Sequence, residues 1–412
     1  MTAKVLKTTA ITQKVMRDYY AACRASKASG RKVAWATAGM PTELLVAADI
    51  DVSFPENHSA TCGTKQMGAQ LCEMAEAAGL SQETCSYVRV DLGVRNGGPS
   101  PWGGLPDPDI IFCCTVSCTT VVKWFQDVQR HYGCELVVVD MPYNFDEKIT
   151  DHSVGYIVQQ LEETIKRIEK VTGRPFDRAR LEATVELSKQ ACDYWEKCLE
   201  LGATKPSPIS TTDMLVNMGP IVCLRGTQAA VDVYKALYEE LSERVAEGYV
   251  AAGEERFRLV WDNIPFWFAL GSTVRRLSEL GAVLVGATYL YHWVRHLEPK
   301  NPLVSLAREF STSTTMNRSV AHKIDKVGKM LKTYQADGLI IHSNRSCKVD
   351  SLGSLDLQRE IKARLGIPVL MVDGDHTDPR AFSEAVVQTR IEAFIEGLEK
   401  LRAAGGVQRA NV

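Results

Sequence analysis

Cysteine is the residue type in this sequence with the clearest capacity for specific chemistry. Twelve cysteines occur in 412 residues, and residues 1–14 contain no apolar stretch of the kind that a secretion signal requires. We therefore expect a reducing, cytoplasmic environment, in which cysteines bind metal or pack as small buried side chains. No Cys-x-x-Cys pair occurs, which argues against zinc ribbons, thioredoxin-type redox pairs and the bacterial ferredoxin motif. Any metal site must be assembled by the fold.

Two of these cysteines are placed like ligands. Cys118 follows a predicted strand at residues 109–114, and Cys347 follows a predicted strand at residues 338–342. In parallel sheets, ligands bind beyond the carboxyl ends of the strands. Cys118 also begins a predicted helix, whose unpaired amides should favour its thiolate and lower its pKa. Five others lie in apolar helical patterns and are predicted to be buried, namely Cys23, Cys72, Cys192, Cys198 and Cys223.

The elements that must position these residues alternate between strand and helix. An apolar strand at residues 33–36 leads through a glycine turn into a helix at residues 42–48. The same order recurs in the strand at 109–114, the helix at 119–130 and the strand at 135–140. Short continuous apolar runs between helices indicate buried parallel strands.

The middle of the chain changes character and reads as helical. Helices are predicted at residues 153–170, 177–201 and 227–247, with Asp177 as the N-cap of the second. The strand and helix alternation then resumes. Its predicted strands lie at 257–261, 283–286, 338–342 and 367–373, and its predicted helices at 265–280 and 380–401, the last capped by Asp373, Asp375 and Asp378 near Pro379.

These elements predict an α/β protein with two doubly wound parallel-sheet domains of flavodoxin or Rossmann-like type, joined by a helical segment. We expect an N-terminal domain at residues 1–150, which contains Cys85 and Cys118. The linking segment would be residues 151–250, and a C-terminal domain at residues 251–412 would contain Cys347.

Charge and motifs exclude several function classes. The 48 Lys and Arg residues nearly balance 50 Asp and Glu residues, so no bulk charge attracts nucleic acid or an anionic membrane. No run approaches the roughly 20 apolar residues that span a bilayer. The dinucleotide, P-loop, nucleophile-elbow and metalloprotease motifs are all missing from the sequence. If ATP is used, another subunit must use it.

Six segments, in order along the chain, resemble the 2-hydroxyacyl-CoA dehydratase and benzoyl-CoA reductase family. They begin with residues 33–43 and 54–60, and continue with Cys85-Ser86-Tyr87-Val88-Arg89, residues 113–124, residues 344–348 and residues 373–380. The resemblance is closest to the larger, substrate-binding subunit of the (R)-2-hydroxyacyl-CoA dehydratases. It implies an acyl-CoA substrate, a homologous smaller partner subunit and a separate ATP-hydrolysing iron–sulfur activator.

The resemblance also implies a ligand set and a chemistry. Cys85, Cys118 and Cys347 would hold a [4Fe-4S] cluster whose fourth iron position is open to water or to the thioester carbonyl. Cys85 joins the other two only through this resemblance, because its spacing does not select it. One electron from the activator would give a ketyl radical anion, which makes the β-proton acidic enough to remove.

Four further site residues follow from the resemblance and from their position. Glu56 aligns with a family carboxylate and is our candidate for proton transfer, and Thr37 could supply a hydroxyl beside it. His292 and Trp293, after the predicted strand at 283–286, could line the acyl pocket. No basic stripe marks a site for the CoA phosphates.

Alternatives remain open at this point. The chain has Ala36-Thr37-Ala38 where related dehydratases tend to carry Ser-Thr-Ser, and Thr115-Val116-Ser117 where they often carry asparagines. Both departures favour the substrate-binding subunit of an ATP-dependent benzoyl-CoA reductase. A relative with a double-cubane cluster would recruit further cysteines among Cys62, Cys113, Cys114 and Cys134. In a scaffold subunit without a cluster, the cysteines would merely pack.

Overall fold

Two four-stranded parallel sheets form the frame of the protein. The structure is a computed structural model that describes residues 5–144, 148–251, 253–312 and 318–405. One sheet has the order β2-β1-β3-β4 and the other the order β6-β5-β7-β8. The strands are β1 Val33–Ala36, β2 Asp51–Ser53, β3 Ile110–Cys114, β4 Glu135–Val139, β5 Phe257–Asp262, β6 Ala282–Ala287, β7 Gly338–Asn344 and β8 Val369–Gly374.

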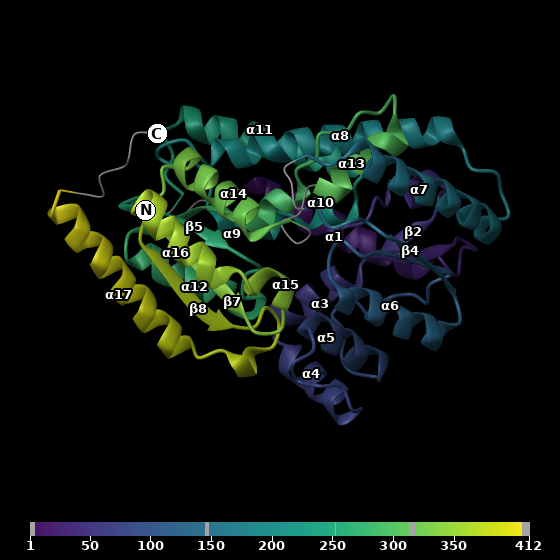
Figure 1. The fold of residues 1–412 in the computed structure, drawn as a ribbon, viewed down its shortest axis with the longest axis horizontal. Coiled ribbons are helices and arrows are strands. Elements are labelled where there is room, and N and C mark those ends of the chain that lie inside the picture. The colour runs from purple at the N-terminus through teal and green to yellow at the C-terminus, as the bar shows by residue number, and fades with distance from the viewer. Residues whose placement is uncertain (1–4, 145–147, 252, 313–317, 406–412) are drawn as a thin grey trace.

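Helices surround both sheets (Figure 1). The first group is α1 Lys7–Ala25, α2 Glu43–Ala47, α3 Pro55–Thr64, α4 Gly68–Ala77, α5 Ser86–Arg95 and α6 Thr119–Tyr132. Residues 151–250 contain α7 Asp151–Thr172, α8 Arg178–Leu201, α9 Thr211–Asn217, α10 Gly219–Cys223 and α11 Gln228–Ala246. The rest are α12 Leu270–Glu279, α13 Pro302–Thr312, α14 Val320–Thr333, α15 Lys348–Ser351, α16 Ser354–Leu365 and α17 Glu384–Ala403.

The predicted α/β class and parallel pairing are confirmed. In the first sheet Trp35 pairs with Ile111, and in the second Val260 pairs with Leu339, both in parallel register. The two orders are the same, and in each the direction of strand progression reverses between the first strand and the third. The division into three units at residues 150 and 250 stays a prediction.

Some element boundaries differ from the sequence expectation. β2 was not predicted, because three residues, Asp51–Ser53, carry no periodicity. The helix predicted from residue 265 begins as the short 3-10 turn Trp267–Ala269, and α12 follows at Leu270. The closing helix begins at Glu384 rather than at residue 380, because the 3-10 turn Pro379–Ala381 precedes it.

Side-chain caps explain several of the helix starts. Asp177 accepts a hydrogen bond from the Arg180 N–H, as predicted for the start of α8. Asp378 accepts one from Arg380 N–H and caps the turn that precedes α17. Asp373 does not cap this turn, because its carboxylate pairs with Arg345 at 2.6 Å.

The helical segment packs against both sheets and shares one core with them. A single hydrophobic cluster includes Phe112 of β3, Trp195 of α8 and Leu259 of β5. Trp195 is fully buried, and its Nε1 donates to the Leu290 carbonyl at 3.1 Å. Helix α7 contacts β4 and helix α9 contacts β6, while α8 and α11 pack against each other along one edge of the molecule (Figure 1).

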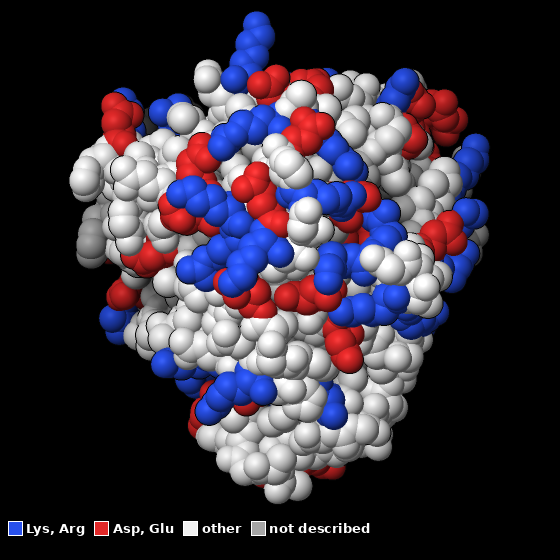
Figure 2. Space-filling view, turned by 90° about the vertical axis from the view of Figure 1, so that its right-hand side faces the viewer, with Lys and Arg blue, Asp and Glu red and all other residues white. Residues whose placement is uncertain are grey.

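Charge on the surface is mixed. On the face in Figure 2, Lys and Arg side chains lie among Asp and Glu side chains, and the lower part of that face carries few charges. Across the described residues, none of the helices is long and apolar enough to cross a membrane.

One buried ion pair fastens the helical segment to the turn after β1. Arg225, after α10, donates from Nε to Glu43 Oε1 at 3.2 Å, and both side chains have no exposed surface. Its Nη2 donates to the Met40 carbonyl at 3.0 Å and to Thr42 Oγ1 at 3.3 Å. Arg225 therefore fixes the path of residues 38–42.

Replacement of Arg225 by alanine should destabilise the fold strongly. Loss of Arg225 leaves the buried Glu43 carboxylate with the Ser188 hydroxyl as a hydrogen-bond donor but without its cation, which costs about 3–5 kcal/mol. Denaturant unfolding would measure this loss. The matched control is Arg178→Ala, which removes an exposed pair with Glu162 and should change the free energy of unfolding by less than about 1 kcal/mol. Similar small effects of the two variants would contradict the structural role of Arg225.

Candidate active site

Loops at the carboxyl ends of the strands line two adjoining cavities. The large cavity has a volume of about 1090 Å³ and the small cavity about 590 Å³. The small cavity receives residues that follow every strand but β4, namely Ala38, Glu56, Cys118, Ile264, Tyr289, Cys347 and His376. Met141, after β4, lines the large cavity. The reversal points of both sheets therefore open onto one site, as expected for parallel sheets.

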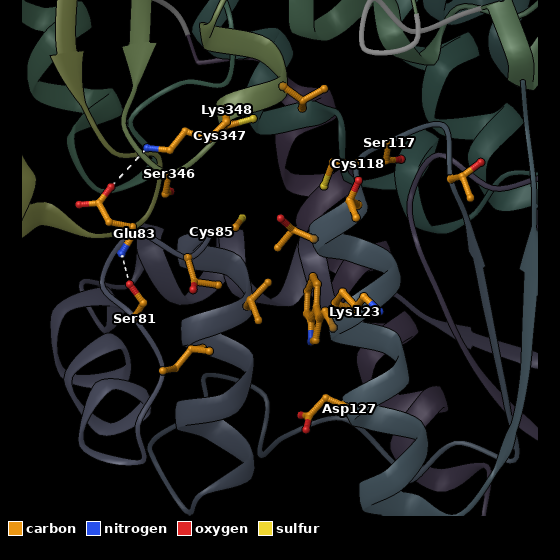
Figure 3. A pocket seen from close by; sticks show the side chains of 18 of the residues that line it. Ser81, Glu83, Cys85, Ser117, Cys118, Lys123, Asp127, Ser346, Cys347 and Lys348 are labelled. Carbon is orange, nitrogen blue, oxygen red and sulfur yellow. Dashed lines mark hydrogen bonds and ion pairs between the residues drawn. The ribbon is translucent and has the colours of Figure 1, made fainter. Parts of the chain in front are cut away.

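Cys85, Cys118 and Cys347 lie where the two cavities meet. All three residues line both cavities. Each is the residue directly before a helix, α5, α6 and α15 respectively. Figure 3 shows their sulfur atoms directed toward the same open space. The structure thus brings together the three cysteines that sequence analysis singled out, although they lie far apart along the chain.

Burial controls the electrostatics of these thiols. Burial and, to a smaller extent, the neighbouring Cys118 raise the pKa of Cys85 to about 12, although the backbone amides of Tyr87 and Val88 act to lower it. The pKa of Cys347 is also raised, by burial and then by Asp350 and Cys85. Our expectation of a lowered pKa for Cys118 is wrong for the metal-free protein. The amides of Val121 and Thr120 do lower its pKa, but burial raises it more.

The three thiols surround an open volume and do not converge on a single point. Within the described ranges, no three His, Cys, Asp or Glu side chains form a group that could hold a single metal ion. Three thiols around a shared cavity wall are, however, the donor type that iron–sulfur clusters take. The cysteines considered for a larger cluster are Cys62, Cys113, Cys114 and Cys134, and none of them lines either cavity.

Glu56 faces the small cavity from the first turn of α3. Its Oε2 accepts a hydrogen bond from Ala38 N–H at 2.5 Å. Burial raises the pKa of Glu56 to about 7, and the Ala38 hydrogen bond lowers it only in part. A carboxyl group with this pKa exchanges a proton readily at neutral pH.

Thr37 precedes Ala38, whose N–H group binds Glu56, but it does not line the small cavity. Its side chain is fully buried, and it is not among the residues that line either cavity. Its hydroxyl lies near the Cys114 thiol, whose pKa it helps to lower. The role of Thr37 in the reaction stays a prediction.

His292 and Trp293 both line the small cavity from the short 3-10 segment Thr288–Trp293 after β6. Burial lowers the pKa of His292 to about 3, with Lys326 adding to the shift, so this imidazole is neutral. Trp293 Nε1 is buried, and none of the described residues accepts a hydrogen bond from it. The imidazole that lines this part of the cavity is therefore uncharged.

Sequence analysis missed several residues of the small cavity. Tyr87 and Tyr289 line it, and the Tyr87 hydroxyl accepts a hydrogen bond from Trp267 Nε1 at 2.6 Å. Arg17 and Lys65 also line it, and both are exposed, so they mark its opening to solvent. No pattern signals Arg17 or Lys65, since Arg17 lies on α1 and Lys65 directly follows α3. Position after a strand could have indicated Tyr289.

Glu56→Gln should change how stability depends on pH. Because the pKa of folded Glu56 lies above the unfolded value of 4.5, the protonated carboxyl favours folding, and this contribution is lost as pH rises through about 7. The amide cannot ionise, so the variant should be as stable as wild type at pH 4.5 and more stable by up to about 3 kcal/mol at pH 8. Denaturant unfolding across this range measures the difference. A constant difference would contradict the raised pKa.

Comparison with known proteins shows the family of this chain. The family described as 2-hydroxyglutaryl-CoA dehydratase, D-component, matches residues 37–398. The (R)-2-hydroxyisocaproyl-CoA dehydratase alpha subunit of Clostridioides difficile is 32% identical over 391 residues, 94% of this chain and 95% of that protein. One of the subunits of benzoyl-CoA reductase from Thauera aromatica is 32% identical over 402 residues, 93% of each chain. The chain therefore belongs to the 2-hydroxyglutaryl-CoA dehydratase, D-component family of enzymes, and it is similar to dehydratase and benzoyl-CoA reductase subunits alike.

Proposed function

We propose that this chain is the iron–sulfur, substrate-binding subunit of an (R)-2-hydroxyacyl-CoA dehydratase, which eliminates water to give a 2-enoyl-CoA. The observation that carries the proposal is the meeting of Cys85, Cys118 and Cys347 at the boundary of the two cavities. Substrate would occupy the small cavity on one side of this boundary. The electron would arrive from the other side.

The three cysteines would hold a [4Fe-4S] cluster with one iron position open. A coordinated thiol is deprotonated by the metal charge, so the raised thiol pKa values would not persist in the loaded protein. The backbone amides that approach the Cys85 and Cys118 sulfurs would then stabilise thiolates. When bound, the cluster supplies one-electron reduction of the thioester, through which a ketyl radical anion would form.

Glu56 would carry the proton transfer. Elimination breaks the C–O bond at C2 and one C–H bond at C3, and the two fragments leave as water. A carboxylate can take the C3 proton, and the same carboxyl group can then protonate the departing hydroxide. The pKa of about 7 suits both steps, and the Ala38 amide would keep Oε2 in place between them.

The walls of the small cavity suit an acyl thioester. Trp293 and the neutral ring of His292 line it without adding a charge that would have to be neutralised. At the opening, Arg17 and Lys65 offer two exposed cations for the phosphates of CoA.

The large cavity would face the partners. Its lining carries both signs of charge, since Lys348 pairs with Glu83 at 3.3 Å (Figure 3) and Arg130 pairs with Asp127 at 3.7 Å. The relatives named as alpha subunits support a heteromeric assembly. We infer a homologous smaller subunit and an ATP-hydrolysing iron–sulfur activator as partners, in the cytoplasm.

A benzoyl-CoA reductase subunit is the second candidate. The identity to the Thauera aromatica reductase chain is 32%, equal to that of two of the dehydratase relatives. Ala36 and Ala38 also depart from the serines expected in dehydratases. In this case the same site would deliver an electron to an aromatic ring, and Glu56 would protonate it.

Iron content tests the ligand set. The complex purified without oxygen should contain about four iron atoms for the cluster in this chain, and Cys118→Ala or Cys347→Ala should lose most of it. Cys192→Ala is the matched control, since Cys192 is fully buried and lines neither cavity. An iron-free wild type would remove the proposal. Turnover of benzoyl-CoA but of no 2-hydroxyacyl-CoA ester, with activator, ATP and reductant, would select the reductase.

Loss of the cations at the opening should weaken substrate binding. The variant with Arg17→Ala and Lys65→Ala should raise KM for the acyl-CoA about tenfold, equivalent to about 1.4 kcal/mol, with little change in kcat. Steady-state kinetics measures both constants. Lys14→Ala is the control, because Lys14 lies on the same helix, pairs with Asp18 at 2.6 Å and does not line the cavity. An unchanged KM in the double variant would place the CoA phosphates elsewhere.

A further inference from the structure

A buried hydrogen-bond network joins two of the three cysteines through His376. His376 follows β8, is fully buried and lines the small cavity. Its Nε2 lies 3.8 Å from Cys85 Sγ and 2.9 Å from Ser86 Oγ. Its Nδ1 lies 2.8 Å from Asn344 Nδ2. The ring therefore stands between the turn that carries Cys85 and the strand that leads to Cys347.

The orientation of the Asn344 amide determines which ring nitrogen of His376 carries the proton. Asn344 Oδ1 accepts hydrogen bonds from the backbone N–H groups of Ser346 and Cys347, each at 3.2 Å. The other amide atom, Nδ2, is consequently the one that faces His376, and it can only donate. His376 Nδ1 must accept, so the ring proton resides on Nε2. The N–H group of His376 points toward Ser86 and Cys85.

Ser86 and Cys85 share the N–H group of His376 as acceptors. The Ser86 hydroxyl lies 2.9 Å from His376 Nε2, which carries the ring proton, and it also helps to lower the pKa of Asp375. Ser86 Oγ therefore acts as an acceptor toward His376, and the Nε2 proton is shared between that oxygen and Cys85 Sγ. A sulfur acceptor at 3.8 Å is at a longer distance than an oxygen acceptor, in keeping with the larger radius of sulfur.

The loop that carries His376 is tied to the helix that follows Cys85. Arg89 of α5 donates from Nη1 to Asp378 Oδ2 at 2.7 Å, and both side chains are buried. Ser86 N–H donates to Ser346 Oγ at 3.2 Å. These bonds link residues that lie 260 or more positions apart in the chain. The distance from His376 to Cys85 is thus set by the surrounding structure.

We propose that His376 is a positioning residue that donates an N–H···S hydrogen bond to Cys85 and thereby raises the reduction potential of the cluster. The inference rests on the proposed function, in which Cys85 binds iron. A donor toward a ligand sulfur stabilises the reduced cluster, which carries one more negative charge. Asn344 sets the tautomer of His376 and holds the backbone of Cys347, so one amide group acts on both ligands.

The test is the midpoint potential of the loaded complex, followed by EPR during a redox titration. His376→Phe keeps an aromatic ring but removes the donor, and it should favour the oxidised cluster about tenfold more, a fall of about 59 mV for one electron. His376→Gln supplies an amide N–H and should recover part of the shift. His342→Phe is the control, because His342 is fully buried but lines neither cavity, and it should keep the wild-type potential.

Ser86→Ala should shift the midpoint potential in the opposite direction to His376→Phe. Without the competing oxygen, the His376 N–H is directed to Cys85 alone, so the potential should rise, whereas a purely structural role predicts no rise. If wild type holds iron and both His376→Phe and Ser86→Ala keep its potential, the inference fails while the proposed function stands. If wild type binds no iron, the proposed function itself fails. A His376→Phe protein that does not fold leaves Ser86→Ala to decide the matter.

Discussion

Parallel pairing is the constraint on which the rest of this structure depends. Strands that run parallel end at the same edge of their sheet, so all their following loops are gathered there. Here the gathering happens twice, and the loops of both sheets open onto the same pair of cavities. Cys118 and Cys347 follow the third strand of the first and second sheet respectively. Two equivalent positions therefore carry two of the three cysteines proposed as ligands.

Burial raises the pKa of the acidic side chains in this site. Burial raises the pKa of Glu56 to about 7 and that of Cys85 to about 12, because each charged form loses hydration. Iron bound to sulfur would offset this loss for the thiols directly. Glu56 is not a proposed ligand and stays governed by burial and by the Ala38 amide. One cavity lined by buried side chains could thus contain thiolates bound to metal beside a carboxyl group that still exchanges its proton.

Local pattern predicted most strands and two of the three central cysteines, because an apolar run and the residue after it are properties of nearby sequence. Cys85 follows no strand, so only resemblance to a family could select it. β2 has three residues and no period to detect. The tautomer of His376 depends on Asn344, 32 positions away, and its second partner Ser86 lies 290 positions away. Such contacts exist only once the chain has folded.

In the turn after β1, a backbone N–H group holds Glu56, while the side chains of the turn determine what lines the small cavity. Glu56 is held by the backbone N–H of Ala38, which any residue except proline would supply. Ala36 and Thr37 are fully buried, and of these three positions only Ala38 lines the small cavity. A serine at position 36 would therefore not reach the small cavity, whereas position 38 lines it next to the Glu56 contact. The departure from the dehydratase pattern thus bears on the reaction through position 38, while Arg225 keeps the turn itself in place.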